Sequence, residues 1–270
     1  MGTTHVVSNA LAAPDPRAKA LQRVDVRAGR WLINGVINGG DSLAEGAARL
    51  GSARLGSARL GSARLGYGQG DIAVEALVGT AFQARPNQMK DAPVFIPHTR
   101  PERGPLWFAE PRTALLSAVP DPATPAAARG IVEGVLFADR MIIESCIGAQ
   151  QRTLYASGAF GYEPELPQLL ADALDRDILV VDESHLPAIG AAAMCVDVLE
   201  GKAVPPPQAR LVRPRPEWRN VVAARWQYYR QVWSTVTGSQ PPSTVDETIE
   251  TLSPVASTAK SQRPIRSVLT

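Results

Sequence analysis

Residues 154–199 alternate between stretches typical of strands and stretches typical of helices. Residues 154–157 and 178–181 are short and apolar, whereas 164–174 and 186–199 carry apolar residues at helical spacing. Such alternation is typical of an α/β layer, in which helices pack on a sheet. We therefore expect an α/β core.

The residues before this segment predict further strands and helices. Residues 3–8 are β-branched and apolar and predict a strand that opens directly from Gly2, and residues 24–26 and 31–33 flank a glycine-containing turn and predict a hairpin. A turn rich in glycine and asparagine follows and leads into a helix, with Asp41 or Ser42 as the expected N-cap. The other expected elements are a helix at 71–82, a buried strand at 93–96 and a long helix at 124–150.

A short repeat interrupts this pattern at residues 46–66, where Gly-Ser-Ala-Arg-Leu recurs in identical copies. A five-residue period turns an α-helix by about 500°, so successive leucines move by about 140° and form no single face. Solenoid units are longer, at about 20 residues or more. We interpret the repeat as an insertion that lengthens a surface helix or loop, and a basic docking segment is the alternative.

A change of composition at Gly201 divides the chain into three expected parts. Residues 1–201 form the domain, and residues 202–237 are expected to form a proline-rich linker and one helix that carries Trp218, Trp226, Tyr229 and Trp233. Residues 238–270 are rich in Ser, Thr and Pro with few apolar side chains, which predicts a disordered tail.

The charge of the chain argues against nucleic acid and membrane as partners. The net charge is +2 and the basic residues are scattered. No apolar run reaches the roughly 18–20 residues of a membrane span, and no signal peptide is evident, so we expect a cytoplasmic protein. The three histidines lie far apart, and we expect Cys146 and Cys195 to be buried thiols, so no metal ligand is assigned.

A set of motifs, in the same order, resembles the C-terminal domain of FGGY carbohydrate kinases, gluconokinase- and xylulokinase-like members in particular. The most specific are the loop with Glu102-Arg103-Gly104-Pro105-Leu106-Trp107 and the helix with Arg129-Gly130-Ile131-Val132-Glu133-Gly134. The others are Gly2-Thr3-Thr4 with the strand after it, the turn at 35–40, and Ala156-Ser157-Gly158-Ala159-Phe160 with the helices that follow. The resemblance covers residues 2–201.

The resemblance implies an α/β domain of the actin-like and hexokinase-like ATPase (ribonuclease H-like) fold, one half of a two-domain kinase. It implies ATP and Mg2+ as cofactors, with nucleotide contacts from Gly2, Thr3, Thr4, Gly39, Gly40, Ser157, Gly158, Ala159 and Glu163. The physical argument agrees, because glycine turns let backbone N–H groups approach phosphates closely. We expect Glu102 and Arg103 to form an ion pair that fixes their loop, and Glu133 to have a structural role.

Departures from the family pattern limit the expected activity. Ala159 stands where the second glycine of the adenine turn is usual, and Glu163 and Glu165 would repel phosphates, so we expect weak ATP binding. The family's catalytic aspartate lies just upstream of the position that Gly2 matches, so no catalytic residue is assigned. A sugar or sugar acid would then need an N-terminal kinase half as partner. The alternatives are a non-catalytic remnant of a truncated gene and a nucleotide-binding module, and we expect self-association through the exposed interdomain face.

Overall fold

The computed structural model describes residues 4–25, 29–50, 69–116, 124–147, 154–158, 160, 163–183, 185–202 and 204–242. Gly2, Thr3, Ala159, most of the 46–66 repeat and all but the first residues of the expected tail lie outside these ranges. Within them, no helix is both long enough and apolar enough to cross a membrane.

The first sheet is antiparallel and three-stranded, in the order β1-β3-β2. Strand β1 (His5–Leu11) pairs along its whole length with β3 (Trp31–Ile37), and β2 (Leu21–Val24) pairs with the other edge of β3. Strand β3 lies in the middle and is the most buried of the three, with Ile33 and Ile37 in the core. The pairing of Val24 with Trp31 confirms the predicted hairpin.

Helix α3 (Pro125–Ile147) is the centre of the molecule. Its side chains are buried around nearly the whole circumference, including the polar side chains of Arg129, Glu133 and Asp139. The first sheet, α1 (Gly39–Arg49), α2 (Gln69–Phe82) and β4 (Val94–His98) all pack against it. Strand β4 follows the 3-10 helix η2 (Pro86–Asp91) and pairs antiparallel with β5 (Arg112–Leu116), a strand that the sequence did not predict.

The start of α1 corrects one expectation. The helix begins at Gly39, with Asn38 as its N-cap residue, so Asp41 and Ser42 lie inside the first turn rather than at the cap. Ser42 is buried, and its hydroxyl donates to the carbonyl oxygen of Pro97. The neighbouring strand β4 therefore uses the hydroxyl that was expected to cap the helix.

A second three-stranded sheet has the order β6-β7-β8. Strands β6 (Leu154–Ala156) and β7 (Ile178–Val180) are parallel, and α5 (Leu166–Leu174) connects them, as the alternating pattern predicted. Strand β8 (Arg210–Val212) pairs antiparallel with β7 and lies in the segment expected to be a linker. It has three residues, of which only Val212 is buried, so it has no alternating pattern from which a strand could be predicted.

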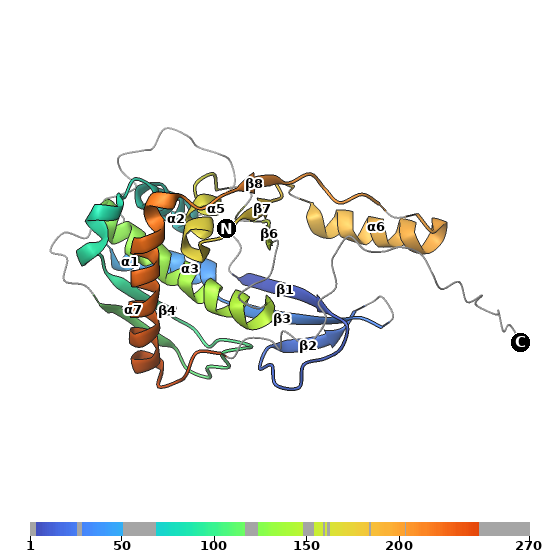
Figure 1. Ribbon diagram of the computed structural model, residues 1–270, viewed down its shortest axis with the longest axis horizontal. Helices are drawn as coiled ribbons and strands as arrows, with labels where there is room; N and C mark the ends of the chain where they lie inside the picture. The colour runs from blue at the N-terminus through green and yellow to red at the C-terminus, as the bar shows by residue number, and fades with distance from the viewer. Residues whose placement is uncertain are drawn as a thin grey trace, which may run out of the picture.

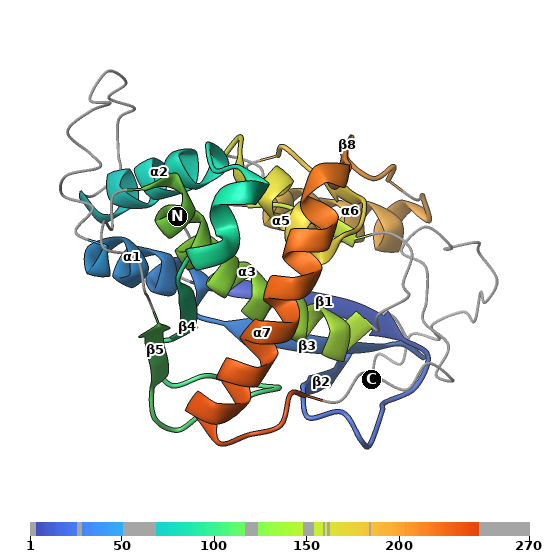
Figure 2. The same cartoon turned by 60° about the vertical axis from the view of Figure 1, so that its left-hand side comes forward.

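The last helix, α7 (Arg219–Thr237), follows the 3-10 helix η3 (Pro216–Trp218) and lies across α3 (Figures 1 and 2). Its buried face, together with Trp218, has helical spacing: Trp218, Val222, Trp226, Tyr229 and Trp233. Trp226 and Tyr229 stack on each other, and both rings contact Phe137 of α3. The aromatic helix is therefore part of the same hydrophobic core as α3.

Helix α6 (Leu186–Glu200) differs from the others because none of its residues is buried. It stands apart from the main body in Figure 1, and Val198 and Leu199 are each 82% exposed. Cys195 on this helix is exposed, which corrects the expectation of a buried thiol, whereas Cys146 on α3 is buried. Both cysteines are free.

Candidate functional site

A cavity of about 500 Å³ lies between β1, α3 and the turn that follows β6. Four of the residues predicted from the sequence line it: Thr4, Ser157, Gly158 and Glu163. Thr4 precedes β1 and the other three lie between β6 and α5, so residues about 150 positions apart in the sequence meet at one hollow. Ligand pockets commonly enclose about 300–1,000 Å³, so the volume suits a small organic ligand.

The turn after β6 can let a ligand come close to the backbone. Gly158 has a φ of 68°, in the left-handed region that side chains rarely adopt, and a Cβ placed there would meet nothing within 4 Å. Ser157 before it is exposed. This is the strand-to-helix position at which α/β layers offer backbone N–H groups to ligands.

Gly39 and Gly40 occupy a different place from the one expected. Neither is among the residues found to line the cavity. Gly39 instead lies against the ring of His5, so closely that a Cβ would come within 2.2 Å of Nδ1. Since His5 lines the cavity, Gly39 supports the cavity wall from behind.

His5 and Asp139 form a buried pair in that wall, which sequence reasoning missed. Nδ1 of His5 donates to Oδ2 of Asp139 at 2.9 Å, and the edge of the imidazole meets the ring of Phe160 with centroids 5.3 Å apart. Burial by itself lowers the pKa of His5, but the charge of Asp139, their hydrogen bond and the charge of Glu102 together raise it above its ordinary value. The sequence did contain a sign of this pair, because Asp139 is a carboxylate on a side of α3 that is otherwise apolar.

Glu102 lies behind the same wall and has partners other than the one expected. Its Oε1 accepts from Nδ1 of His98 at 3.2 Å, and its Oε2 accepts from the backbone N–H and the side-chain amide of Asn38 at 3.2 and 3.0 Å. The expected ion pair with Arg103 is therefore replaced by hydrogen bonds to His98 and Asn38. The carboxylate holds the loop to the beginning of α1, because Asn38 is the residue at the N-cap position of that helix.

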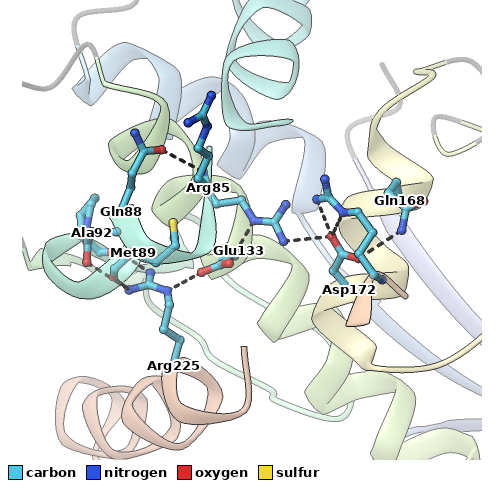
Figure 3. Close-up of polar contacts among 11 residues, drawn as sticks. Arg85, Gln88, Met89, Ala92, Glu133, Gln168, Asp172 and Arg225 are labelled. Carbon is cyan, nitrogen blue, oxygen red and sulfur yellow. Dashed lines mark hydrogen bonds and ion pairs between the residues drawn. The ribbon is translucent and has the colours of Figure 1, made fainter. Parts of the chain in front are cut away.

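A buried network of arginines and carboxylates joins α3, α5 and α7 (Figure 3). Glu133 accepts from Nε of Arg129 at 3.0 Å and from Nε of Arg225 at 2.5 Å. Asp172 accepts from Nη2 of Arg215 at 2.7 Å and from Nη2 of Arg129 at 3.4 Å. The guanidinium of Arg129 also stacks over the ring of Trp218, at 4.1 Å from its centroid.

This network is separate from the cavity, because none of its members lines it. It joins α3 to α5 through Asp172 and to α7 through Arg225, whose guanidinium also donates to carbonyl oxygens of Met89, Ala92 and Pro93. Glu133 therefore braces three segments rather than contacting a ligand.

The part of the chain that the structure describes contains no group of three or more His, Cys, Asp or Glu side chains placed to hold a metal ion. Burial raises the pKa of the Cys146 thiol to about 12, against a smaller opposite effect of its hydrogen bond with Ser145. Cys146 is therefore a protonated packing residue at neutral pH.

The three sheets, the central helix and the cavity define a mixed α/β domain with a ligand-sized hollow at the ends of two strands. The family described as "FGGY family of carbohydrate kinases, C-terminal domain" matches residues 3–196. The chain therefore belongs to the FGGY family of carbohydrate kinases, and the matched part is its C-terminal domain. No curated relative matches the sequence.

Solved structures of similar fold include carbohydrate kinases from several organisms. A ligand-bound xylulose kinase from Lactobacillus acidophilus has a TM-score of 0.70 at 18% identity over 88% of this chain and 46% of that chain. A gluconate kinase from Lactobacillus acidophilus has 0.67 at 18% over 88% and 46%, and a Plasmodium falciparum glycerol kinase with ADP has 0.57 at 12% over 86% and 46%. The chain spans less than half the length of these kinases, and its fold is that of one half of an actin-like ATPase.

Proposed function

We propose that this domain binds ATP in the cavity between Thr4 and the Ser157-Gly158 turn, as the nucleotide-binding half of a carbohydrate kinase. The observation that carries the proposal is the convergence of Thr4, Ser157, Gly158 and Glu163 on one cavity in a domain of this family. Gly2, Thr3 and Ala159 are proposed contacts on the same two turns. Gly39 contributes through the wall behind His5, and Gly40 follows it in the first turn of α1.

The cavity suits a nucleotide in volume and in the chemistry of its walls. Hydroxyl groups come from Thr4 and Ser157, and aromatic surface comes from Tyr155 and Phe160. Asp139 faces the same space, but its charge is matched by His5. These groups offer polar contacts to phosphates and apolar surface to a base.

Glu163 opposes the same ligand, because its carboxylate would repel a polyphosphate. Mg2+ would reduce that repulsion. Since the described residues offer no ready cluster of ligands, Mg2+ would be held mainly by the phosphates of the nucleotide. We therefore expect ATP affinity to be weak and to depend on magnesium.

In the complete reaction ATP supplies the phosphoryl group that is transferred to a hydroxyl of a sugar or sugar acid. The residues of this chain would bind the phosphates, orient the nucleotide and exclude water from one side of the cleft. The general base and most sugar contacts would come from an N-terminal kinase half.

Calorimetric titration of Mg-ATP against a matched pair of variants tests the site. Gly158→Glu adds bulk and negative charge to the turn, and we expect it to weaken ATP binding about tenfold or more. Gly201→Glu is the control, because Gly201 also has a positive φ with open space around its Cβ position but is not among the residues that line the cavity. Equal affinities for the two variants would place the ATP site elsewhere.

A further inference from the structure

We propose that Glu102, oriented by a chain of hydrogen bonds that begins at Trp233, positions the beginning of α1 and through it the His5 wall of the cavity. The chain consists of Trp233, His98, Glu102 and Asn38, and we name it the α7 chain because Trp233 lies on α7. The inference rests on the proposed ATP site. It gives residues beyond the matched range 3–196 a positioning role there.

Donation in the α7 chain converges on Glu102 from both ends. An indole N–H can only donate, and Nε1 of Trp233 lies 2.8 Å from Nε2 of His98, so Nε2 must accept. The imidazole is then neutral, with its proton on Nδ1, and it donates to Oε1 of Glu102. Oε2 of Glu102 accepts from the backbone N–H of Asn38 and from its side-chain amide. Glu102 thus receives donors on both oxygens, which suits a carboxylate and no other side chain of its size.

Burial fixes the donor and acceptor role of each group in the α7 chain. His98 is 0% exposed, and Trp233 and Glu102 are also buried. Phe108 packs against the rings of both His98 and Trp233 and fixes their orientation. Water therefore has no access to replace a broken hydrogen bond, and two donors that face each other here would push the groups apart.

The last member of the chain connects it to the cavity. Asn38 immediately precedes α1, and the next residue, Gly39, touches the ring of His5. His5 lines the cavity and is held on its other side by Asp139. A change in the position of Asn38 would therefore move His5, although Glu102, His98 and Trp233 do not themselves line the cavity.

Glu102→Gln tests the chain with almost no change of volume. A glutamine has one acceptor oxygen and one amide donor, so it must point its N–H groups either at Asn38 or at His98. The first orientation opposes donors directly. The second forces the proton of His98 onto Nε2, where it faces the indole N–H of Trp233. We expect Glu102→Gln to displace Asn38 and with it His5, and so to weaken Mg-ATP binding by about tenfold, while the unsatisfied buried group lowers the thermal midpoint.

The double variant Glu102→Gln/Trp233→Phe should recover much of this loss. Phenylalanine removes the indole donor, so His98 can carry its proton on Nε2 and accept from the glutamine at Nδ1. We expect the ATP affinity of the double variant to return to within about threefold of the Trp233→Phe single variant. Trp226→Phe is the control, because Trp226 is a buried tryptophan on the same helix that packs on Phe137 and Tyr229. Glu102→Gln/Trp226→Phe should show no recovery.

Two measurements on the full chain separate this inference from the proposed function. The ¹⁵N spectrum of His98 should show the proton on Nδ1 in the wild type and on Nε2 in Glu102→Gln/Trp233→Phe, and the thermal midpoint should follow the same pattern of loss and recovery. If the wild type binds no ATP, the proposed ATP site is wrong, and the α7 chain has no ATP site to position. If the wild type binds ATP, then unchanged affinity in Glu102→Gln, or equal recovery with Trp226→Phe, overturns the inference.

Discussion

Arg225 donates from Nε to Oε2 of Glu133 at 2.5 Å, and so joins the last helix of the domain to the middle of the central one. Glu133 is fully buried, and its other oxygen is bound by Arg129 on the same helix. Two guanidinium groups therefore compensate one carboxylate in the core. Since Arg129 is shared with Asp172, which itself binds Arg215, loss of any member leaves a buried charge short of partners.

Arg225→Met is expected to lower the free energy of unfolding by about 3–5 kcal/mol, because breaking a buried ion pair leaves an uncompensated charge. Urea unfolding followed by tryptophan fluorescence measures the change. Arg230→Met is the control on the same helix, since Arg230 is exposed and contacts the face of Trp226. We expect it to cost less than about 1 kcal/mol. Equal losses in the two variants would mean that Glu133 does not depend on Arg225.

Trp218→Ala should be similarly destabilising, by about 3–5 kcal/mol, because a large buried ring is removed and a cavity remains. Trp218 is 1% exposed and supports the guanidinium of Arg129. The aromatic residue Tyr228 offers a comparison, since it is about half exposed on α7 and its replacement by alanine should cost little.

A chain that stops at Gly201 loses the whole aromatic face, and its thermal unfolding should no longer be cooperative.

The His5–Asp139 pair predicts a pH dependence of stability. The pKa of His5 is raised in the folded protein, so the pair contributes fully below the ordinary histidine pKa of 6.5 and its contribution is lost as pH rises through the raised value. The difference in unfolding free energy between the wild type and Asp139→Asn should therefore shrink as pH rises through that range. A difference that is constant between pH 5 and pH 9 would contradict a charged His5.

The exposed side of α6 predicts an apolar surface that can be measured. Val198 and Leu199 lie near the end of this helix and are almost fully exposed. The double variant Val198→Glu/Leu199→Glu should reduce binding of a hydrophobic dye and shift the sedimentation profile toward the monomer, with little change in the unfolding midpoint. Unchanged dye binding would show that these side chains are covered in solution.

Catalysis gives a further prediction for the chain as it stands. The proposed function takes the general base from an N-terminal kinase half, and such a base commonly contributes about 10²–10⁴-fold, so we expect sugar-dependent release of ADP by this chain alone to stay at the background rate. Supplying the N-terminal half of an FGGY kinase in trans should restore turnover if the domain is functional, and Gly158→Glu should abolish the restored rate. Sugar-dependent turnover by the chain alone would refute the requirement for a second half.

The sequence predicted most of the fold because its elements have strong local patterns. The apolar positions of α3, α5 and α7 recur at helical spacing, and their observed bounds lie within a few residues of those expected. Strand β8 has no such pattern, since its residues are mostly exposed and are defined only by pairing with β7. Its place depends on tertiary contacts that no local window contains.

The candidate site was predicted in part, for a related reason. Thr4, Ser157 and Gly158 were predicted because their turns resemble those of a kinase family, and all three line the cavity. The pairing of His5 with Asp139 joins residues 134 positions apart, and that of His98 with Trp233 joins residues 135 apart. Each of these side chains has several plausible partners in the sequence, and only the packed structure selects one.

The antiparallel pairing of β8 with β7 also has a consequence for the chain during synthesis. A ribosome releases the N-terminal residues first, so β7 emerges with one edge unpaired and Glu133 and Asp172 emerge before Arg225 and Arg215. At that stage the edge of β7 is unpaired, and Glu133 and Asp172 lack some of their arginine partners. An unpaired strand edge is a site where nascent chains associate. This domain therefore cannot complete its folding until β8 and α7 have left the exit tunnel.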